Sequence, residues 1–258
     1  MSAPQRPILA GNWKMNHGPS ETARFFADFL ALHAPRETGS VVFFPPALSF
    51  AAAREAIQGR PDIRLGVQNV HWEKGGAFTG EHSVAIAADA GAELVLVGHS
   101  ERRWVFGETS EDAARKVRAV LDGGLVPVLC VGEKIEERRA GREVQVVEAQ
   151  LQPVLDAVSM DEARALVIAY EPVWAIGTGE TATPADAAAM HAAIRARLTT
   201  AYGSEIADAL PILYGGSVKA DNAAELLAQP GVDGVLVGGA SLDAKGFAAI
   251  CAAICAAV

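Results

Sequence analysis

Short runs of apolar, often β-branched residues alternate with stretches of helical periodicity along the whole chain. Several of these runs are apolar at every position, which is typical of strands that are covered on both faces. The pattern therefore predicts a parallel sheet with helices between its strands. The predicted strands are residues 8–11, 41–44, 63–67, 94–97, 126–131, 166–170, 212–214 and 234–237.

The intervening segments carry signals for the beginnings of helices. Ser20 and Ser110 can each cap a helix. Thr183 is a good cap before Pro184, because proline suits the first position of a helix. A helix after each strand fits an α/β fold, a single (β/α)8 barrel domain over residues 1–258. An open, doubly wound sheet is the competing architecture, since periodicity cannot show closure.

Composition and charge exclude several classes of protein. The chain has 258 residues, 50% of them apolar and 21% charged, which excludes a disordered chain. A net charge of −9 argues against a nucleic-acid-binding surface, although a few local donors can hold a phosphate on an acidic protein. Residues 1–6 lack the apolar core of a secretory signal, and no stretch reaches the roughly 20 apolar residues of a membrane span. Cys130, Cys251 and Cys255 show no metal-ligand spacing, so we expect reduced thiols in a cytoplasmic protein.

Candidate catalytic residues follow three of the predicted strands. Lys14 comes after the first strand and His99 after the fourth, although an isolated lysine or histidine there is often a surface or structural residue. Glu171 comes directly after the apolar sixth strand and before Pro172. We expect this carboxylate to be partly desolvated, which would make it a stronger base. In a parallel sheet these strand ends meet at one edge, where active sites form.

The segment after Glu171 is apolar, contains Gly177 and Gly179, and ends before Thr183. This composition predicts a lid that moves as a body over a bound substrate. The alternative is a rigid loop that is buried against a partner chain.

Paired glycines follow the last two predicted strands, in the sequences YGGSV (214–218) and VGGAS (237–241). Glycine pairs expose backbone N–H groups and let an anion approach closely. One pair alone indicates only a turn. Two pairs at equivalent strand ends favour a phosphate site, because the loops after strands seven and eight of barrels frequently bind phosphate.

Taken together, five segments resemble the signatures of the triosephosphate isomerase family, in the family's order. They are NWKMN (12–16), GHSERR (98–103), YEPVWAIGTG (170–179), YGGSV (214–218) and VGGAS (237–241). The resemblance covers essentially the whole chain, and the third segment is the most specific. It implies an aldose–ketose isomerase of glycolysis and gluconeogenesis, which interconverts dihydroxyacetone phosphate and D-glyceraldehyde 3-phosphate through an enediolate. It also implies that neither a metal nor an organic cofactor is needed.

The resemblance assigns a role to each matching position. Glu171 would be the base that moves a proton between two substrate carbons, and His99 a neutral imidazole that polarises the carbonyl. Lys14 would supply positive charge and Asn12 a hydrogen bond to the substrate, with Glu101 supporting the site from behind. The backbone N–H groups that would hold the phosphate belong to Gly177, Ser217, Gly238 and Gly239.

The resemblance also implies a lid that closes over the intermediate and prevents it from expelling its phosphate. Glu180 departs from the family pattern, which usually has lysine there, and this puts the electrostatics of the lid's C-terminal hinge in question. The lid residues are Pro172, Val173, Trp174, Ala175, Ile176, Gly177, Thr178, Gly179, Glu180 and Thr181.

A long loop, residues 68–81, follows the third predicted strand. In the family this loop inserts into a neighbouring subunit, so the resemblance implies a homodimer. Phe78 would seek burial there, and Thr79 would approach Asn12 and Lys14 of the partner subunit. A disordered surface excursion is the alternative.

Two other functions compete with the isomerase. A different sugar-phosphate isomerase or aldolase would need a Schiff-base lysine or metal ligands inside the barrel, and neither emerges at the strand ends. A non-catalytic phosphometabolite-binding barrel should have lost Glu171, His99 or Lys14, yet the sequence retains all three.

Overall fold

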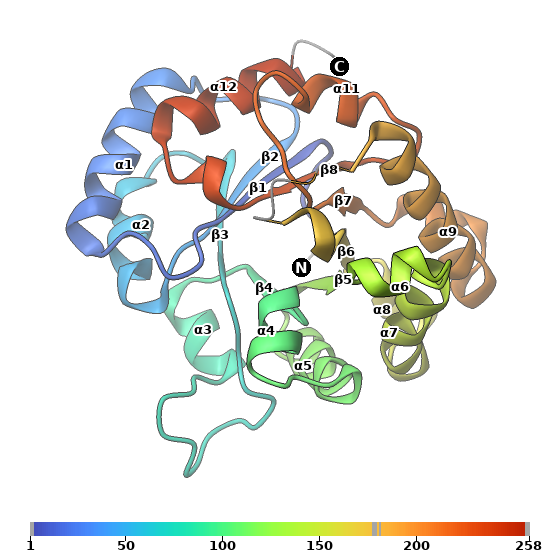
Figure 1. The fold of residues 1–258 in the computed structure, drawn as a ribbon. Helices are drawn as coiled ribbons and strands as arrows, with labels where there is room; N and C mark the ends of the chain where they lie inside the picture. Colours follow the sequence, from blue (N-terminus) through green and yellow to red (C-terminus); the bar gives the residue numbers. More distant parts are fainter. Residues whose placement is uncertain (1–2, 177–179, 181, 256–258) are drawn as a thin grey trace.

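The computed structural model describes residues 3–176, 180 and 182–255. Within these residues, eight parallel strands follow one another in chain order around a closed barrel, and helices surround it (Figure 1). The barrel confirms the predicted fold class and excludes the open sheet. The strands are β1 (Ile8–Asn12), β2 (Ser40–Phe44), β3 (Ile63–Val67), β4 (Leu94–Val97), β5 (Val126–Val131), β6 (Val167–Tyr170), β7 (Ile212–Tyr214) and β8 (Gly234–Val237).

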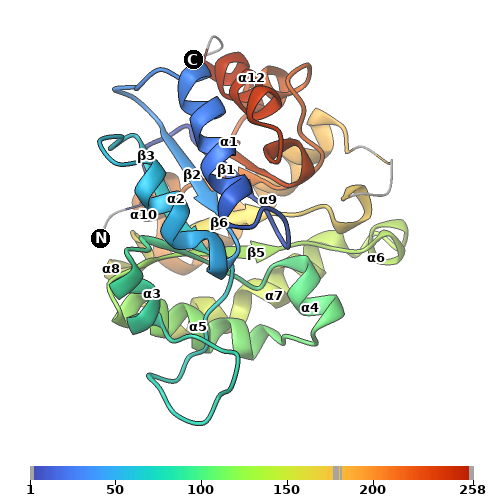
Figure 2. The ribbon, with the colours of Figure 1, turned by 90° about the vertical axis from the view of Figure 1, so that its left-hand side faces the viewer.

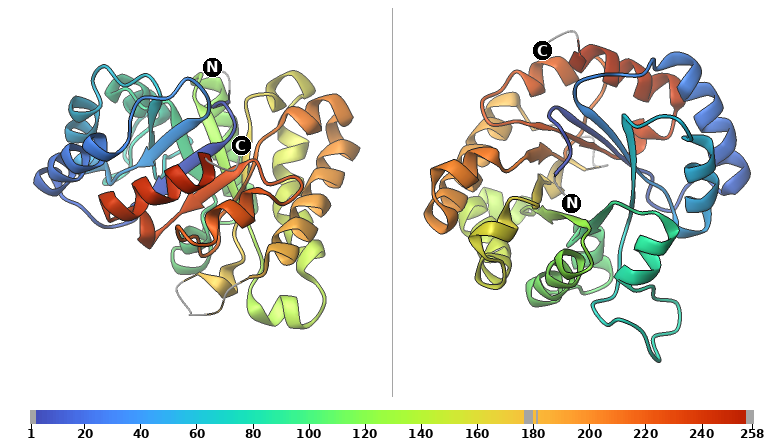
Figure 3. Two further views of the ribbon diagram at one scale, coloured as in Figure 1. Left: turned by 90° about the horizontal axis from the view of Figure 1, so that it is seen from above. Right: turned by 180° about the vertical axis from the view of Figure 1, so that it is seen from behind.

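The helices form an outer layer that packs against the barrel and against neighbouring helices (Figure 3). None of the helices in the described part of the chain is both long and apolar enough to cross a bilayer. The helices are α1 (Pro19–Leu32), α2 (Phe50–Ala56), α3 (Val84–Ala90), α4 (Ser100–Val105), α5 (Ser110–Asp122), α6 (Ile135–Arg139), α7 (Glu143–Ala157), α8 (Met160–Ala163), α9 (Pro184–Tyr202), α10 (Ser204–Ala209), α11 (Ala223–Leu227) and α12 (Ala244–Cys255), with the short 3₁₀ turns η1 (Ala47–Ser49), η2 (Val173–Ala175) and η3 (Gly239–Ser241).

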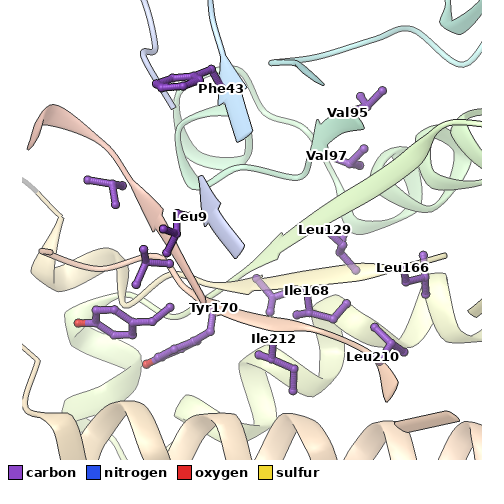
Figure 4. Close-up of a cluster of buried hydrophobic side chains, with 14 of the residues drawn as sticks. Leu9, Phe43, Val95, Val97, Leu129, Leu166, Ile168, Tyr170, Leu210 and Ile212 are labelled. Carbon is purple, nitrogen blue, oxygen red and sulfur yellow. The ribbon is translucent and has the colours of Figure 1, made fainter. Parts of the chain in front are cut away.

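The strand predictions are confirmed closely. Five have the observed bounds, β1 and β2 are each one residue longer than predicted, and β6 begins at Val167 rather than at 166. The strands read as continuous apolar runs because both of their faces are buried. One face fills the barrel interior, and the other packs under the helices, where Leu9, Phe43 and Ile168 lie (Figure 4).

Two of the predicted helix caps are wrong by one or two residues. Helix α1 begins at Pro19 with Gly18 as its cap, because proline has no N–H to satisfy in the first turn. Helix α5 is capped by Thr109 rather than Ser110, since the Thr109 hydroxyl accepts the N–H of Asp112 at 3.0 Å. The predicted Thr183 cap of α9 is confirmed.

Closure of the barrel depends on a close approach of β8 to β1. Gly234 pairs with Ile8, and a Cβ atom on Gly234 would lie 2.1 Å from the Ile8 carbonyl oxygen. Any side chain would therefore push the two strands apart. This glycine permits the first and last strands to pair, and so to bring all strand ends to one rim.

We expect Gly234→Ala to lower the free energy of unfolding by about 3 kcal/mol, because the methyl group has no space at the closure. Gly141→Ala is a suitable control: Gly141 has φ +65°, but nothing lies within 4 Å of its added Cβ. Backbone strain alone should cost about 1 kcal/mol there. Urea unfolding of both variants measures the difference, and equal losses would contradict the role of Gly234 in closure.

Candidate active site

A cavity of about 420 Å³ opens at the carboxyl-terminal rim of the barrel. It brings together most of the residues that the sequence singled out, from both ends of the chain. Gly177 lies outside the described residues, and so do Thr178, Gly179 and Thr181 of the lid. The residues that line the cavity are Asn12, Lys14, His99, Glu171, Ala175, Ile176, Gly215, Gly216, Ser217, Val218, Lys219, Leu236, Val237, Gly238, Gly239 and Ala240.

The centre of the site is a contact between a buried imidazole and a buried carboxylate. His99 Nε2 lies 2.9 Å from Glu171 Oε1, and the Ser100 N–H donates to Glu171 Oε2 at 2.9 Å. On the other side of the ring, the Glu101 N–H donates to His99 Nδ1 at 3.2 Å. Because Nδ1 accepts a hydrogen bond, the proton of a neutral ring must be on Nε2, where it points to Glu171.

The sequence predicts that burial makes Glu171 a stronger base, and the groups around its carboxylate correct part of this prediction. Burial, at 2% exposure, raises its pKa as expected, but the contact with His99 and the Ser100 N–H lower it, and the net direction is downward. Burial lowers the pKa of His99, while the neighbouring Glu171 carboxylate raises it, with a net upward direction. The two groups therefore stabilise each other, and Glu171 is a weaker base here than burial alone would make it.

Lys14 reaches the cavity from an unusual backbone conformation. Its φ is +53°, and its N–H donates to the Asn12 Oδ1 atom at 3.0 Å. The Gln68 side chain donates to the Lys14 carbonyl at 2.8 Å, and this hydrogen bond fixes the peptide group that follows Lys14. Lys14 Nζ lies 2.8 Å from Glu101 Oε1, so the expected supporting role of Glu101 takes the form of an ion pair with Lys14.

Both glycine pairs line the cavity, and at the pair after β7 a side chain would not fit. A Cβ on Gly215 would lie 2.9 Å from Glu171 Cγ, and one on Gly216 would lie 2.2 Å from the Tyr214 hydroxyl. Gly238 faces Lys14, because its Cβ would lie 3.5 Å from Lys14 Cε. The arrangement gives an anion both backbone contacts and a nearby cation.

The described first part of the lid is attached to a buried carboxylate that the sequence reasoning missed. Glu133 Oε1 accepts hydrogen bonds from Trp174 Nε1 at 2.8 Å and from the Tyr170 hydroxyl at 3.1 Å. Burial raises the pKa of Glu133, while these donors lower it, and the net direction is upward. The sequence did contain a signal for Glu133, because this residue comes shortly after β5 just as Glu171 comes directly after β6.

His191 supports the site from the helix layer. It is fully buried on α9, its ring meets the Tyr170 ring edge-on at 6.0 Å, and its Nδ1 lies 2.9 Å from the Gly231 carbonyl oxygen. Burial lowers the pKa of His191 to about 4. The folded protein therefore keeps this imidazole neutral at the back of β6.

The fold and the site define a class: a parallel (β/α)8 barrel whose carboxyl-terminal rim carries a buried histidine–carboxylate pair, a lysine and two glycine pairs around one cavity. A family model described as triosephosphate isomerase matches residues 7–254. This chain belongs to the triosephosphate isomerase family.

Proteins curated as triosephosphate isomerase are similar along nearly the whole chain. One from Solibacter usitatus is 48% identical over 246 residues, which are 95% of this chain and 98% of the relative. One from Chloroflexus aurantiacus is 50% identical and covers 93% of this chain and 96% of its own. One from Xanthomonas campestris is 49% identical and covers 98% and 99% respectively.

The buried His191 predicts a loss of stability in acid. An unfolded imidazole titrates near pH 6.5 and the folded one near 4, so the unfolded state binds more protons between these values. The free energy of unfolding should therefore fall by up to about 3 kcal/mol as the pH drops through this window. Urea unfolding of wild type and His191→Gln at several pH values measures this contribution. Equal pH slopes for the two proteins would contradict it.

Proposed function

We propose that the chain interconverts dihydroxyacetone phosphate and D-glyceraldehyde 3-phosphate by proton transfer through an enediolate. The observation that carries the proposal is the 2.9 Å contact between His99 and Glu171, which lies inside a cavity flanked by two glycine pairs. A base beside a neutral hydrogen-bond donor suits proton abstraction next to a carbonyl. The glycine pairs suit the phosphate of the substrate.

Glu171 is the proposed base. In the structure both of its oxygens are engaged, one by His99 and one by the Ser100 N–H. To reach a substrate carbon the carboxylate must exchange these partners for the C–H group. The carboxylate then loses its contacts with His99 and the Ser100 N–H, which lower its pKa, but it stays buried, which raises its pKa. Its basicity therefore increases as it approaches the substrate carbon.

His99 is the proposed electrophile that polarises the substrate oxygens. The largest upward cause on its pKa is the Glu171 carboxylate, which moves away when it turns to the substrate, while the Glu101 carboxylate, 3.7 Å from Nδ1, exerts a smaller upward effect. Burial and the Glu101 N–H on Nδ1 remain, and both favour the neutral ring. The Nε2–H group is then available to the carbonyl oxygen and to the enediolate.

Charge and backbone hold the rest of the substrate in the proposed complex. Lys14 offsets the negative charge of the enediolate and the phosphate, and Asn12 donates a hydrogen bond beside it. Closure of the lid, residues 172–181, excludes water and holds the phosphate against expulsion. The proposed phosphate ligands are the N–H groups of Gly177, Ser217, Gly238 and Gly239.

We expect Glu171→Gln to lower kcat roughly 10²–10⁴-fold while the protein stays folded, because the amide cannot accept the proton. Coupled assays in both directions, without added metal, measure the conversion. Glu225→Gln, an exposed change on α11, is the matched control and should keep wild-type activity. A folded wild type that converts no triose phosphate would contradict the proposal and favour a non-catalytic phosphometabolite-binding barrel. Conversion of hexose phosphates instead would favour another sugar-phosphate isomerase.

We also propose a cytoplasmic homodimer of single-domain subunits over residues 1–258. The support is a loop between β3 and α3 that projects from the barrel (Figures 1 and 2). Its Phe78 is 42% exposed, and near the site Met15 is 95% exposed. Large apolar side chains on a projecting loop and at the rim favour burial against a second copy. In the dimer, Thr79 approaches Asn12 and Lys14 of the partner subunit.

Phe78→Glu should weaken this dimer at least roughly tenfold, because it places a charge in an apolar contact. Sedimentation of wild type and variant across protein concentrations measures the change. Met160→Glu is the control, since Met160 is 54% exposed on α8 and lies outside the proposed interface. Monomeric wild-type protein with full activity would contradict the dimer.

A further inference from the structure

Arg103 is a buried cation that pairs with no carboxylate in the described part of the chain. It lies on α4, one turn after His99, and is only 8% exposed. Burying a guanidinium costs free energy unless its donors are satisfied. Here they are satisfied by uncharged oxygens: Nε donates to the Gly98 carbonyl at 2.7 Å, Nη1 to Ser110 Oγ at 3.0 Å, and Nη2 to the Cys130 carbonyl at 3.2 Å.

The first of these contacts fixes the residue that precedes His99. Gly98 has φ +68°, and its N–H donates to Glu108 Oε1 at 2.9 Å while its carbonyl accepts from Arg103. Arg102 and Lys116 form ion pairs with Glu108, so the charge of this carboxylate is balanced without Arg103. Both polar groups of Gly98 are therefore held, and the turn that aims the His99 ring into the cavity has little freedom.

The contact with the Cys130 carbonyl ties this turn to the strand next to Glu171. Cys130 lies on β5 and pairs with Ala169 of β6. One residue further along β5, the Val131 carbonyl accepts the N–H of Glu171 at 2.8 Å. The guanidinium thus links the segment after β4, which contains His99, to the end of β5, whose Val131 carbonyl accepts the N–H of Glu171.

We propose that Arg103 is a positioning residue for the reaction: it sets the distance and orientation between His99 and Glu171 without contacting the substrate. The inference rests on the proposed function, since it concerns the same acid–base pair. Only a planar fork reaches two carbonyls and a hydroxyl in different directions, and a lysine ammonium on its single stem cannot reproduce all three contacts. A displacement of about 1 Å in a catalytic group can cost on the order of 10²-fold in rate.

The test compares Arg103→Lys and Arg103→Gln with wild type. We expect kcat to fall roughly 10–100-fold in Arg103→Gln, and less in Arg103→Lys, while KM stays within about twofold. Affinity for a hydroxamate mimic of the enediolate should fall by the same factor as kcat, because the mimic needs both His99 and Glu171 in place. Affinity for inorganic phosphate should not change, because phosphate contacts neither group.

Two control variants separate positioning from general stability. Ser110→Ala removes the hydroxyl that accepts from Arg103 Nη1 but leaves both carbonyl contacts of the guanidinium. This variant should keep wild-type kcat. Val154→Ala opens a cavity in the buried face of α7, far from the rim, and calibrates how kcat responds to lost stability alone. Urea unfolding of each variant places the proteins on one scale of stability.

Three results would overturn the inference. The first is an unchanged kcat in folded Arg103→Gln. The second is an equal fall in kcat in Val154→Ala when the two variants have lost the same free energy of unfolding. The third is a fall in phosphate affinity as large as the fall in kcat. Failure of the proposed function is distinguishable, because wild-type protein would then show no isomerisation at all, whatever the behaviour of the variants.

Discussion

The contact between His99 and Glu171 is the interaction on which the rest of the site depends. Neither side chain would be stable alone in its position, because each is buried almost completely. The parallel order of the strands makes the contact possible: it places the ends of β4 and β6 on one rim, separated only by β5. Packing at this point is so close that a Cβ on Gly132 would lie 1.7 Å from the Glu171 carbonyl oxygen. The chain just after β5 therefore packs directly against the backbone of Glu171, and this close packing helps to fix the position of Glu171.

The site also explains how an acidic chain can receive an anionic substrate. The net charge is −9, but the field inside the cavity is set by nearby groups rather than by the whole surface. Lys14 is held in place by Glu101, and the glycine pairs add backbone N–H groups without adding charge. The proposed phosphate recognition is therefore a local property that composition does not reveal.

Much of the fold could be read from the sequence, because the strands of a closed parallel barrel are buried on both sides and leave continuous apolar runs. Five strands were predicted with their observed bounds for this reason. Helix starts were less certain, since Gly18 and Thr109 compete with neighbouring serines and only the three-dimensional hydrogen bonds decide. Lys14, His99, Glu171 and the two glycine pairs line the cavity and stood out in the sequence because they follow strands, whereas Lys219, which also lines it, did not stand out.

What could not be read was the electrostatic state of the site. Burial of Glu171 was predictable, but the lowering of its pKa depends on His99 and the Ser100 N–H, which are distant in sequence. Arg103 stood in a recognised motif, yet two of its three partners are backbone carbonyls, which no side-chain identity in the sequence reveals. Glu133 was missed because its donors, Tyr170 and Trp174, come from another strand end.

We propose that His99 meets the enediolate as a neutral ring with its proton on Nε2. Nitrogen-15 NMR of the labelled imidazole, with a hydroxamate mimic of the enediolate bound, reports the protonation of both ring nitrogens. We expect one protonated nitrogen, Nε2, and an unprotonated Nδ1 that accepts the Glu101 N–H. A ring with both nitrogens protonated in that complex would contradict it.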